Sequence, residues 1–489
     1  MNAKSMTLGL IVGNRGFFPD VLAKDGHETL TKLLKKLGHK VVVLSDKETK
    51  FGSVETWEDA RKCANLFRKK RDEIDGVIVT LPNFGDERGV ADTLKLAGLN
   101  VPVLVHAWQD DARKMDIKHR RDSFCGKMSV CNNLVQYGIP FSLTAQHTMD
   151  PNTPAFQREL HWFAAVCRVV NGLRNCRIGA LGARPAAFNT VRYSEKLFQQ
   201  AGITVETLDL SEVFGTAAKM KDGDKRVVDR LKKITGYTTT KGVPKASLVK
   251  MAKLAVIIDE WMEHYSLDAT AIQCWTSIEE FFGITPCTVM SMMSDSLRSS
   301  ACETDVSGTV SMHALALAAQ SPSFLLDWNN NYGDDPDKCV CFHCSNLPKS
   351  CFTSHSMEYQ EIIAGTVGKE NTYGSLYGRI KAAPMTYCRV STFDTEGSIA
   401  AYIGEGNSRT TRWTPSAVSA SRRSRRCRNY SSSCARTASS TTWRQTTAKS
   451  PARSTRHLIP ISIGRSIGMK GTLDRCGTCE ECLNMGRSR

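Results

Sequence analysis

Short, continuous apolar runs alternate with longer amphipathic segments from the start of the chain. Residues 7–12 (TLGLIV), 76–81 (GVIVTL) and 101–106 (VPVLVH) are runs of the first kind. Residues 20–37 instead place leucines at helical spacing, which predicts a helix with one buried face. Strands that are apolar throughout are typical of parallel sheets covered by helices on both faces. The pattern therefore predicts a doubly wound α/β domain.

A similar alternation restarts after a predicted helix that ends near residue 173. Residues 177–181 (RIGAL) and 269–275 (ATAIQCW) have the composition of buried strands, and long helical patterns lie between them. A chain of 489 residues is also too long for one hydrophobic core. We therefore expect an N-terminal α/β domain over residues 1–173 and a second α/β domain over residues 174–350.

The charge of the chain is concentrated in its last part. Residues 407–489 carry a net charge of +14 out of +16, so the rest of the chain is nearly neutral. A neutral body offers no electrostatic footprint for nucleic acid. No apolar run approaches the roughly 20 residues of a membrane span. The N-terminus lacks a signal-peptide pattern and the 18 cysteines form no framework, so we expect a cytoplasmic protein without disulfides.

Two carboxylates, Glu303 and Asp327, stand out beside breaks between regular elements. Glu303 precedes a helical run over Val306–Ala319, and Asp327 ends a short apolar strand over residues 324–326 and opens into a loop of asparagines. Loops at the carboxyl ends of strands are where α/β proteins place their chemistry. Two carboxylates there could share a divalent cation and still accept a proton. The alternative is purely structural: Glu303 would cap the helix and Asp327 would form an Asx turn.

Two further side chains are candidates for substrate binding. Arg15 lies in the loop that follows the first strand, where its fork of donors could hold a sugar hydroxyl or a phosphate. A solvent-facing turn arginine is an equally good interpretation. His343 follows Asp327 closely, so it could line the same pocket or be an ordinary core histidine.

The cysteines near His343 do not favour a structural zinc site. Cys339, Cys341, His343 and Cys344 are spaced too tightly for paired zinc knuckles, and no second pair follows at the usual separation. Cys476, Cys479 and Cys482 have a better spacing for zinc, but they lie in the unusual C-terminal segment.

That segment differs in composition from everything before it. Residues 407–470 contain 14 Lys and Arg but no Asp or Glu, and periodic apolar positions vanish. It could be a basic arm for nucleic acid or membranes, a linker, or coding sequence translated out of frame. We favour the last reading, because permissible codons read in a shifted frame restore acidic, aromatic and glycine residues. We therefore expect a frameshift near Gly406 and a disordered tail over residues 407–489.

Several motifs together resemble the L-fucose isomerase/L-arabinose isomerase superfamily, and its fucose-isomerase-like branch in particular. The most specific is ACETD, followed 24 positions after its glutamate by the aspartate of LLDWNN. NRGFFP, GARPAAFNT, HCSN and GEG occur in the expected order, so the resemblance covers roughly residues 7–406.

The resemblance implies two Rossmann-like domains without a nucleotide role, followed by a mostly β C-terminal domain. This last domain would begin over residues 351–406 and be incomplete or disordered in this chain. The implied activity is aldose–ketose isomerisation of a fucose- or arabinose-type sugar through a cis-enediol. The implied cofactor is Mn²⁺ or another divalent cation, and the implied assembly is a homo-oligomer with sites near subunit contacts.

Residue by residue, Glu303 and Asp327 match the family's two metal-binding carboxylates, which also act as acid/base groups, and Arg15 matches a substrate-side arginine. The family's third metal ligand, a C-terminal histidine, has no match, although the shifted frame restores a His-His pair. We therefore expect weak metal binding and impaired isomerisation. The rival classes are a non-catalytic sugar-binding protein and a nucleic-acid binder acting through the basic tail, the second of which the neutral body disfavours.

Overall fold

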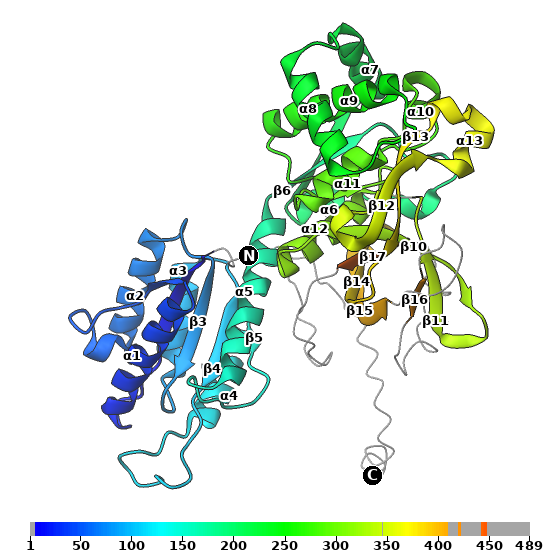
Figure 1. The fold of residues 1–489 in the computed structure, drawn as a ribbon. Coiled ribbons are helices and arrows are strands. Elements are labelled where there is room, and N and C mark those ends of the chain that lie inside the picture. Colours follow the sequence, from blue (N-terminus) through cyan, green and yellow to red (C-terminus); the bar gives the residue numbers. More distant parts are fainter. Residues whose placement is uncertain (1–4, 345, 409–418, 422–441, 447–489) are drawn as a thin grey trace.

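The computed structural model describes residues 5–344, 346–408, 419–421 and 442–446 (Figure 1). The N-terminal domain contains a five-stranded parallel sheet in the order β2-β1-β3-β4-β5. Its elements are β1 (Thr7–Val12), α1 (Asp20–Lys36), β2 (Lys40–Val42), α2 (Trp57–Lys69), β3 (Gly76–Leu81), α3 (Glu87–Ala97), β4 (Val103–Ala107), α4 (Ser123–Gln136), β5 (Ser142–Leu143) and α5 (Pro154–Arg174).

Alternating side chains of the central strands pack against helices on opposite faces of this sheet. Ile11 and Val79 contact the core formed with α2, α3 and α4, whereas Leu10 and Ile78 contact the core formed with α1 and α5. Both faces are therefore covered, which is why the strands are apolar throughout. The predicted doubly wound α/β class is confirmed for this domain.

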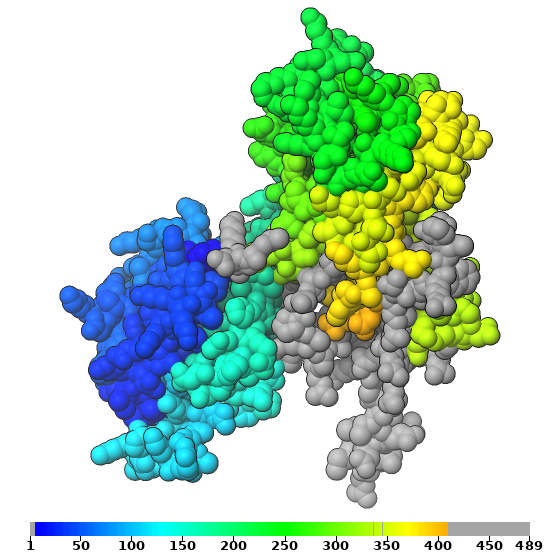
Figure 2. All heavy atoms as spheres, in the orientation of Figure 1, coloured from blue at the N-terminus to red at the C-terminus, as the bar shows by residue number. Residues whose placement is uncertain are grey.

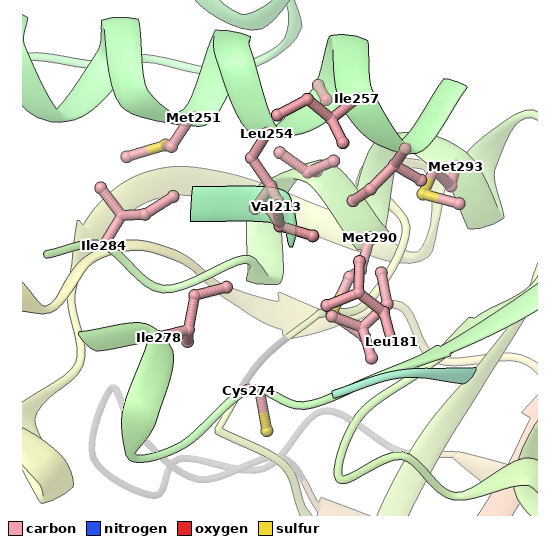
Figure 3. Close-up of a cluster of buried hydrophobic side chains, with 14 of the residues drawn as sticks. Leu181, Val213, Met251, Leu254, Ile257, Cys274, Ile278, Ile284, Met290 and Met293 are labelled. Carbon is pink, nitrogen blue, oxygen red and sulfur yellow. The ribbon is translucent and has the colours of Figure 1, made fainter. Parts of the chain in front are cut away.

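A four-stranded parallel sheet in the order β7-β6-β8-β9 forms the second α/β domain. Its elements are β6 (Cys176–Leu181), α6 (Glu195–Gln200), β7 (Ile203–Leu208), α7 (Leu210–Lys219), α8 (Lys225–Tyr237), α9 (Lys245–His264), β8 (Ala269–Ile272), α10 (Ser277–Phe282), α11 (Cys287–Asp295), β9 (Ser300–Ala301) and α12 (Val306–Ala319). A large cluster of buried aliphatic, methionine and cysteine side chains covers one face, with Met251 of α9 near Ile284, and Leu254 of the same helix near Val213 of α7 (Figure 3).

Helix α5 connects the two sheets physically as well as in sequence. Phe156 and Phe163 in its first half belong to the core of the first sheet, whereas Val169 and Leu173 near its end belong to a core of the second sheet. Arg168 anchors it further by donating hydrogen bonds of 2.8 Å to the carbonyl groups of residues 317 and 318 at the end of α12. One helix thus serves two domains, which form adjacent lobes (Figure 2).

The C-terminal region is built from antiparallel strands, as expected for a mostly β domain. A closed barrel has the strand order β10-β11-β16-β15-β14-β17, and a separate pair joins β12 to β13. The strands and helix are β10 (Ser323–Tyr332), β11 (Asp335–Phe342), β12 (Phe352–Tyr359), α13 (Glu361–Val367), β13 (Tyr373–Ile380), β14 (Pro384–Phe393), β15 (Ser398–Ser408), β16 (Ser419–Ser421) and β17 (Thr442–Thr446). The 3-10 helices are η1 (Lys50–Gly52), η2 (Asn189–Val191), η3 (Lys349–Cys351) and η4 (Lys369–Asn371).

The prediction that Asp327 ends a strand is wrong. Strand β10 continues through the asparagine-rich stretch to Tyr332, because these residues pair with β11 across a hairpin. The second α/β domain expected over residues 174–350 includes β10 and β11, whereas these strands belong to the barrel in the structure.

The predicted tail contributes strands β16 and β17 to this barrel. The rest of residues 409–489, including Cys476, Cys479 and Cys482, lies outside the described residues. In the part of the chain that the structure describes, no helix is both long and apolar enough to cross a membrane.

A buried ion pair joins the barrel to the second α/β domain. Arg389 of β14 donates a hydrogen bond of 2.5 Å to Asp305, and the two side chains are 1% and 0% exposed. Asp305 also caps α12 by accepting a hydrogen bond of 2.7 Å from the backbone of Gly308. The contact therefore fixes the start of α12, two residues after Glu303.

We predict that Arg389→Met lowers the free energy of unfolding by about 3–5 kcal/mol, because it leaves the Asp305 carboxylate buried without its cation. Urea unfolding followed by circular dichroism measures this change. Arg113→Met is the control, since the Arg113–Asp111 pair lies on the surface with Arg113 89% exposed. Equal stability of the two variants would contradict the importance of the buried pair.

Candidate active site

Glu303 lies at the carboxyl end of the second parallel sheet, as the sequence predicts. It follows β9 in a tight turn in which Glu303 and Thr304 both have positive φ, 62° and 49°. The backbone amide of Thr304 donates to the carbonyl of Ile272 at the end of β8, at 3.2 Å. Left-handed backbone costs a non-glycine residue about 1–2 kcal/mol. Glu303 is therefore held in a strained conformation by hydrogen bonds to the neighbouring strand end.

The β10–β11 hairpin presents the other two predicted residues together. Asp327 of β10 is the register partner of Phe342 in β11, and His343 is the next residue after that pair. Asp327 is partly buried, whereas Glu303 and His343 are 5% and 4% exposed. The hairpin register thus explains why residues 16 positions apart reach one place.

The pKa values of the three side chains show that they interact. Burial raises the pKa of Glu303 to about 8 and that of Asp327 to about 6, and nearby His343 opposes both shifts. Burial alone would lower the pKa of His343, but the Cys344 sulfur and the two carboxylates raise it to about 10. Structure and electrostatics therefore bring Glu303, Asp327 and His343 into one group, in which an imidazolium partly balances two carboxyl groups.

Two polar atoms of this group have no hydrogen-bond partner among the described residues, Oε2 of Glu303 and Nε2 of His343. A buried polar atom without a partner is costly, so it marks a place where a ligand could complete the site. Carboxylate oxygens are the ligands that hard divalent cations prefer. Within residues 5–344, 346–408, 419–421 and 442–446, however, no group of three or more His, Cys, Asp or Glu side chains is arranged to hold a metal ion. Two carboxylates fit a divalent cation chemically, but no complete ligand set lies within these ranges.

Arg15 does not join this group within one chain. Its guanidinium donates to the carbonyl of Gly85 at 2.9 Å, forms an ion pair with Glu87 and lies 4.4 Å from the centre of the Phe84 ring. These partners all belong to the N-terminal domain, whose blue lobe lies apart from β10 and β11 (Figures 1 and 2). Arg15 is therefore a partnered side chain at a strand end rather than a free surface arginine.

A further buried acid, Glu279 of α10, was not predicted from the sequence. Neither of its carboxyl oxygens has a hydrogen-bond partner in the part of the chain that the structure describes, and burial raises its pKa to about 9. The nearby Cys287 and Cys344 sulfurs contribute to that shift, and Cys344 also affects the pKa of Glu303. Glu279 lies in the first turn of α10, the helix that follows β8, so a search of the segments after strand ends could have identified it.

Several cysteine side chains lie near the turn that carries Glu303. The Cys302 sulfur interacts with those of Cys274, Cys287 and Cys344, which together with burial raise its pKa well above the usual value. Cys339 and Cys341 are 3.7 Å apart, sulfur to sulfur, on β11. High pKa values keep such thiols protonated and poorly nucleophilic. We therefore assign no nucleophilic role to Cys302.

Comparisons with known proteins agree with the geometry. Residues 9–174 match the family described as fucose/sulfoquinovose isomerase, N-terminal domain, and residues 341–433 match L-fucose isomerase, C-terminal domain. A sulfoquinovose isomerase of Priestia aryabhattai is 25% identical over 279 residues, which are 56% of this chain and 60% of the relative. Sulfoquinovose isomerases of Alkalicoccus urumqiensis and of Clostridium sp. (strain MSTE9) are each 24% identical, over 50% and 36% of this chain and 54% and 40% of their own lengths.

The similarity to these curated relatives thus spans about 60% of their length or less. The two family matches cover the N-terminal α/β domain and much of the C-terminal barrel region, on either side of the turn that carries Glu303. The matched ranges include His343 but neither Glu303 nor Asp327, so the assignment rests on the two domain matches and the relatives. The chain belongs to the fucose-isomerase-like family.

Proposed function

We propose that this protein is an aldose–ketose isomerase. The observation that carries the proposal is the convergence of two buried carboxyl groups and a histidine at the carboxyl end of a parallel sheet. The relatives are named for isomerisation of sulfoquinovose, and the domain families for fucose and sulfoquinovose. We therefore propose a sugar of this general class as the substrate.

The two carboxyl groups are suited to different proton transfers. Asp327, with a pKa of about 6, is largely ionised at neutral pH, whereas Glu303, with a pKa of about 8, largely keeps its proton. Environments that push two pKa values apart commonly separate a base from an acid. In our proposal Asp327 takes the C2 proton of the open-chain aldose, Glu303 moves the hydroxyl proton, and the first proton returns to C1 to give the ketose.

Glu303 and Asp327 are also the residues that would hold Mn²⁺ or another divalent cation. Such an ion, when bound, polarises the sugar carbonyl and acidifies the neighbouring carbon-bound hydrogen. The partnerless oxygen of Glu303 supports this placement. Burial is the main cause of the raised pKa values of both carboxyl groups, and a bound cation would lower them.

The remaining site residues follow from the same proposal. In our proposal His343 holds a sugar oxygen through Nε2, which has no hydrogen-bond partner among the described residues. Arg15 is too far away to act in its own chain, so we propose a homo-oligomer in which it faces a neighbouring copy's substrate.

We predict that Glu303→Gln reduces ketose formation by at least about a hundredfold, because the amide cannot exchange a proton. Glu280→Gln, on the exposed face of α10, is the matched control and should keep wild-type turnover. The assay follows ketose production from a panel of aldoses with added Mn²⁺. A purely sugar-binding protein would instead bind its ligand equally well with Glu303→Gln and after chelation of the metal.

A second prediction concerns pH. Because the folded state raises the pKa of Glu303 from 4.5 to about 8, it keeps a proton that the unfolded state releases, and stability falls as pH rises through that window. The loss reaches at most about 1.4 kcal/mol per pH unit. With a chelator present, the free energy of unfolding of Glu303→Gln should therefore increase relative to that of the wild type as the pH rises from 5 to 8. Urea unfolding tests this, and a difference that is constant with pH would refute it.

We further propose that the chain as written binds metal weakly, because the family's histidine ligand has no counterpart in it. The C-terminal family match extends past Gly406 to residue 433, which counts against a frameshift at Gly406 itself. The nucleotide sequence of the gene decides this point.

The chain as written should retain less than one Mn²⁺ per chain after dialysis and should turn over slowly. Metal analysis and kinetics, side by side with a frame-corrected gene, measure both. Stoichiometric Mn²⁺ and normal turnover in the chain as written would refute the proposed impairment.

A further inference from the structure

A cavity of about 270 Å³ lies away from the carboxylate group, between helices α8, α9 and α11. Its rim carries three basic side chains, Arg230, Lys233 and Arg298, and one acidic side chain, Asp259. The rim therefore has a net charge of +2. Its apolar lining comes from Ala255, Val289, Met292 and Met293.

The single carboxylate does not saturate the basic groups around it. Asp259 forms an ion pair with Arg230 through Oδ2 and another with Arg298 through Oδ1, at 2.9 Å for the second. Each guanidinium has five N–H donors, so most of them are not used by Asp259. Burial, with repulsion from Arg298, lowers the pKa of Arg230. An added anion would relieve that repulsion.

Lys233 forms no ion pair with the described acidic residues. Asp229, one helical turn earlier on α8, pairs instead with Lys225. The Lys233 side chain is exposed at the mouth of the cavity, so its ammonium group can reach a ligand without first breaking a contact.

The floor of the cavity suits an apolar group. Met292 and Met293 are polarisable side chains that pack well against aromatic rings, and Met293 reaches towards α9 in the close-up of the core (Figure 3). A cavity of roughly 150 Å³ is known to accept a benzene ring. This cavity is therefore large enough for a ring as well as a charged group.

We propose that this cavity is a second ligand site, for a small organic anion that carries a phosphate, sulfate or sulfonate group. The three oxygens of such a group match the three cations of the rim, and the apolar part of the ligand would lie against the methionines. The site does not depend on the isomerase proposal, because it shares no residue with the carboxylate group.

The position of Arg298 suggests how such a ligand could be sensed. Arg298 lies between α11 and β9, five residues before Glu303. The amide of Ser300 donates to the Ser294 hydroxyl of α11 at 3.1 Å, so the segment is tied at both ends. An anion held by Arg298 would therefore act on the strand that carries the Glu303 turn.

Phenyl phosphate and inorganic phosphate are the probes, measured by isothermal titration calorimetry on the full chain in a low-salt, phosphate-free buffer. We expect one phenyl phosphate per chain, bound about tenfold or more tightly than inorganic phosphate because its ring leaves water. Lys233→Gln should weaken phenyl phosphate binding about tenfold. Lys232→Gln, an exposed neighbour on α8 outside the cavity lining, should leave it unchanged.

Three outcomes would overturn the proposal. The first is an absence of binding at about 10 mM phenyl phosphate, a concentration on the order of the weakest useful dissociation constant. The second is equal weakening by both lysine variants, which would indicate a diffuse charge effect. The third is loss of binding in Glu303→Gln with retention in Lys233→Gln, which would place the ligand among the carboxylates. That last result would leave the isomerase proposal intact.

Discussion

The buried ion pair between Arg389 and Asp305 holds separate parts of the chain at one point. Arg389 comes from the barrel, Asp305 begins α12, and the strained turn with Glu303 lies immediately before it. Pairs of this kind add little net stability compared with apolar side chains of the same shape. Their value is geometric, because a charge without its partner is not tolerated in the interior. The pair therefore links strand β14 of the barrel to the start of α12, beside the turn that carries Glu303.

The candidate site has little positive charge to balance its carboxyl groups. Glu279, Glu303 and Asp327 all have raised pKa values, and among the described residues that shift them His343 supplies the positive charge next to Glu303 and Asp327. A protein would keep such an expensive arrangement only where proton transfer or cation binding requires it. The thiols of Cys274 and Cys302, whose pKa values are raised, add polarisable bulk without adding charge at neutral pH. The site thus combines a dry interior with groups that change protonation easily.

Much of this arrangement could be predicted from local patterns. Apolar runs and helical periodicity identified both parallel sheets, and the break before Val306 identified Glu303, because these signals depend on neighbouring residues only. The strand around Asp327 was misjudged, since asparagines usually favour turns, and here cross-strand pairing with β11 overrides that preference. Arg389 carries no local signal at all, because its partner lies 84 positions away and only the folded barrel brings them together.

Helix α5 places aromatic side chains on one sheet and aliphatic side chains on the next, so neither lobe has a hydrophobic core of its own that is complete without it. Cutting the chain after residue 174 would leave the apolar end of α5 exposed on the first lobe. It would also remove a helix that covers a hydrophobic core of the second lobe. The two lobes should therefore unfold as one cooperative unit. Insertions between the lobes should be tolerated only outside α5.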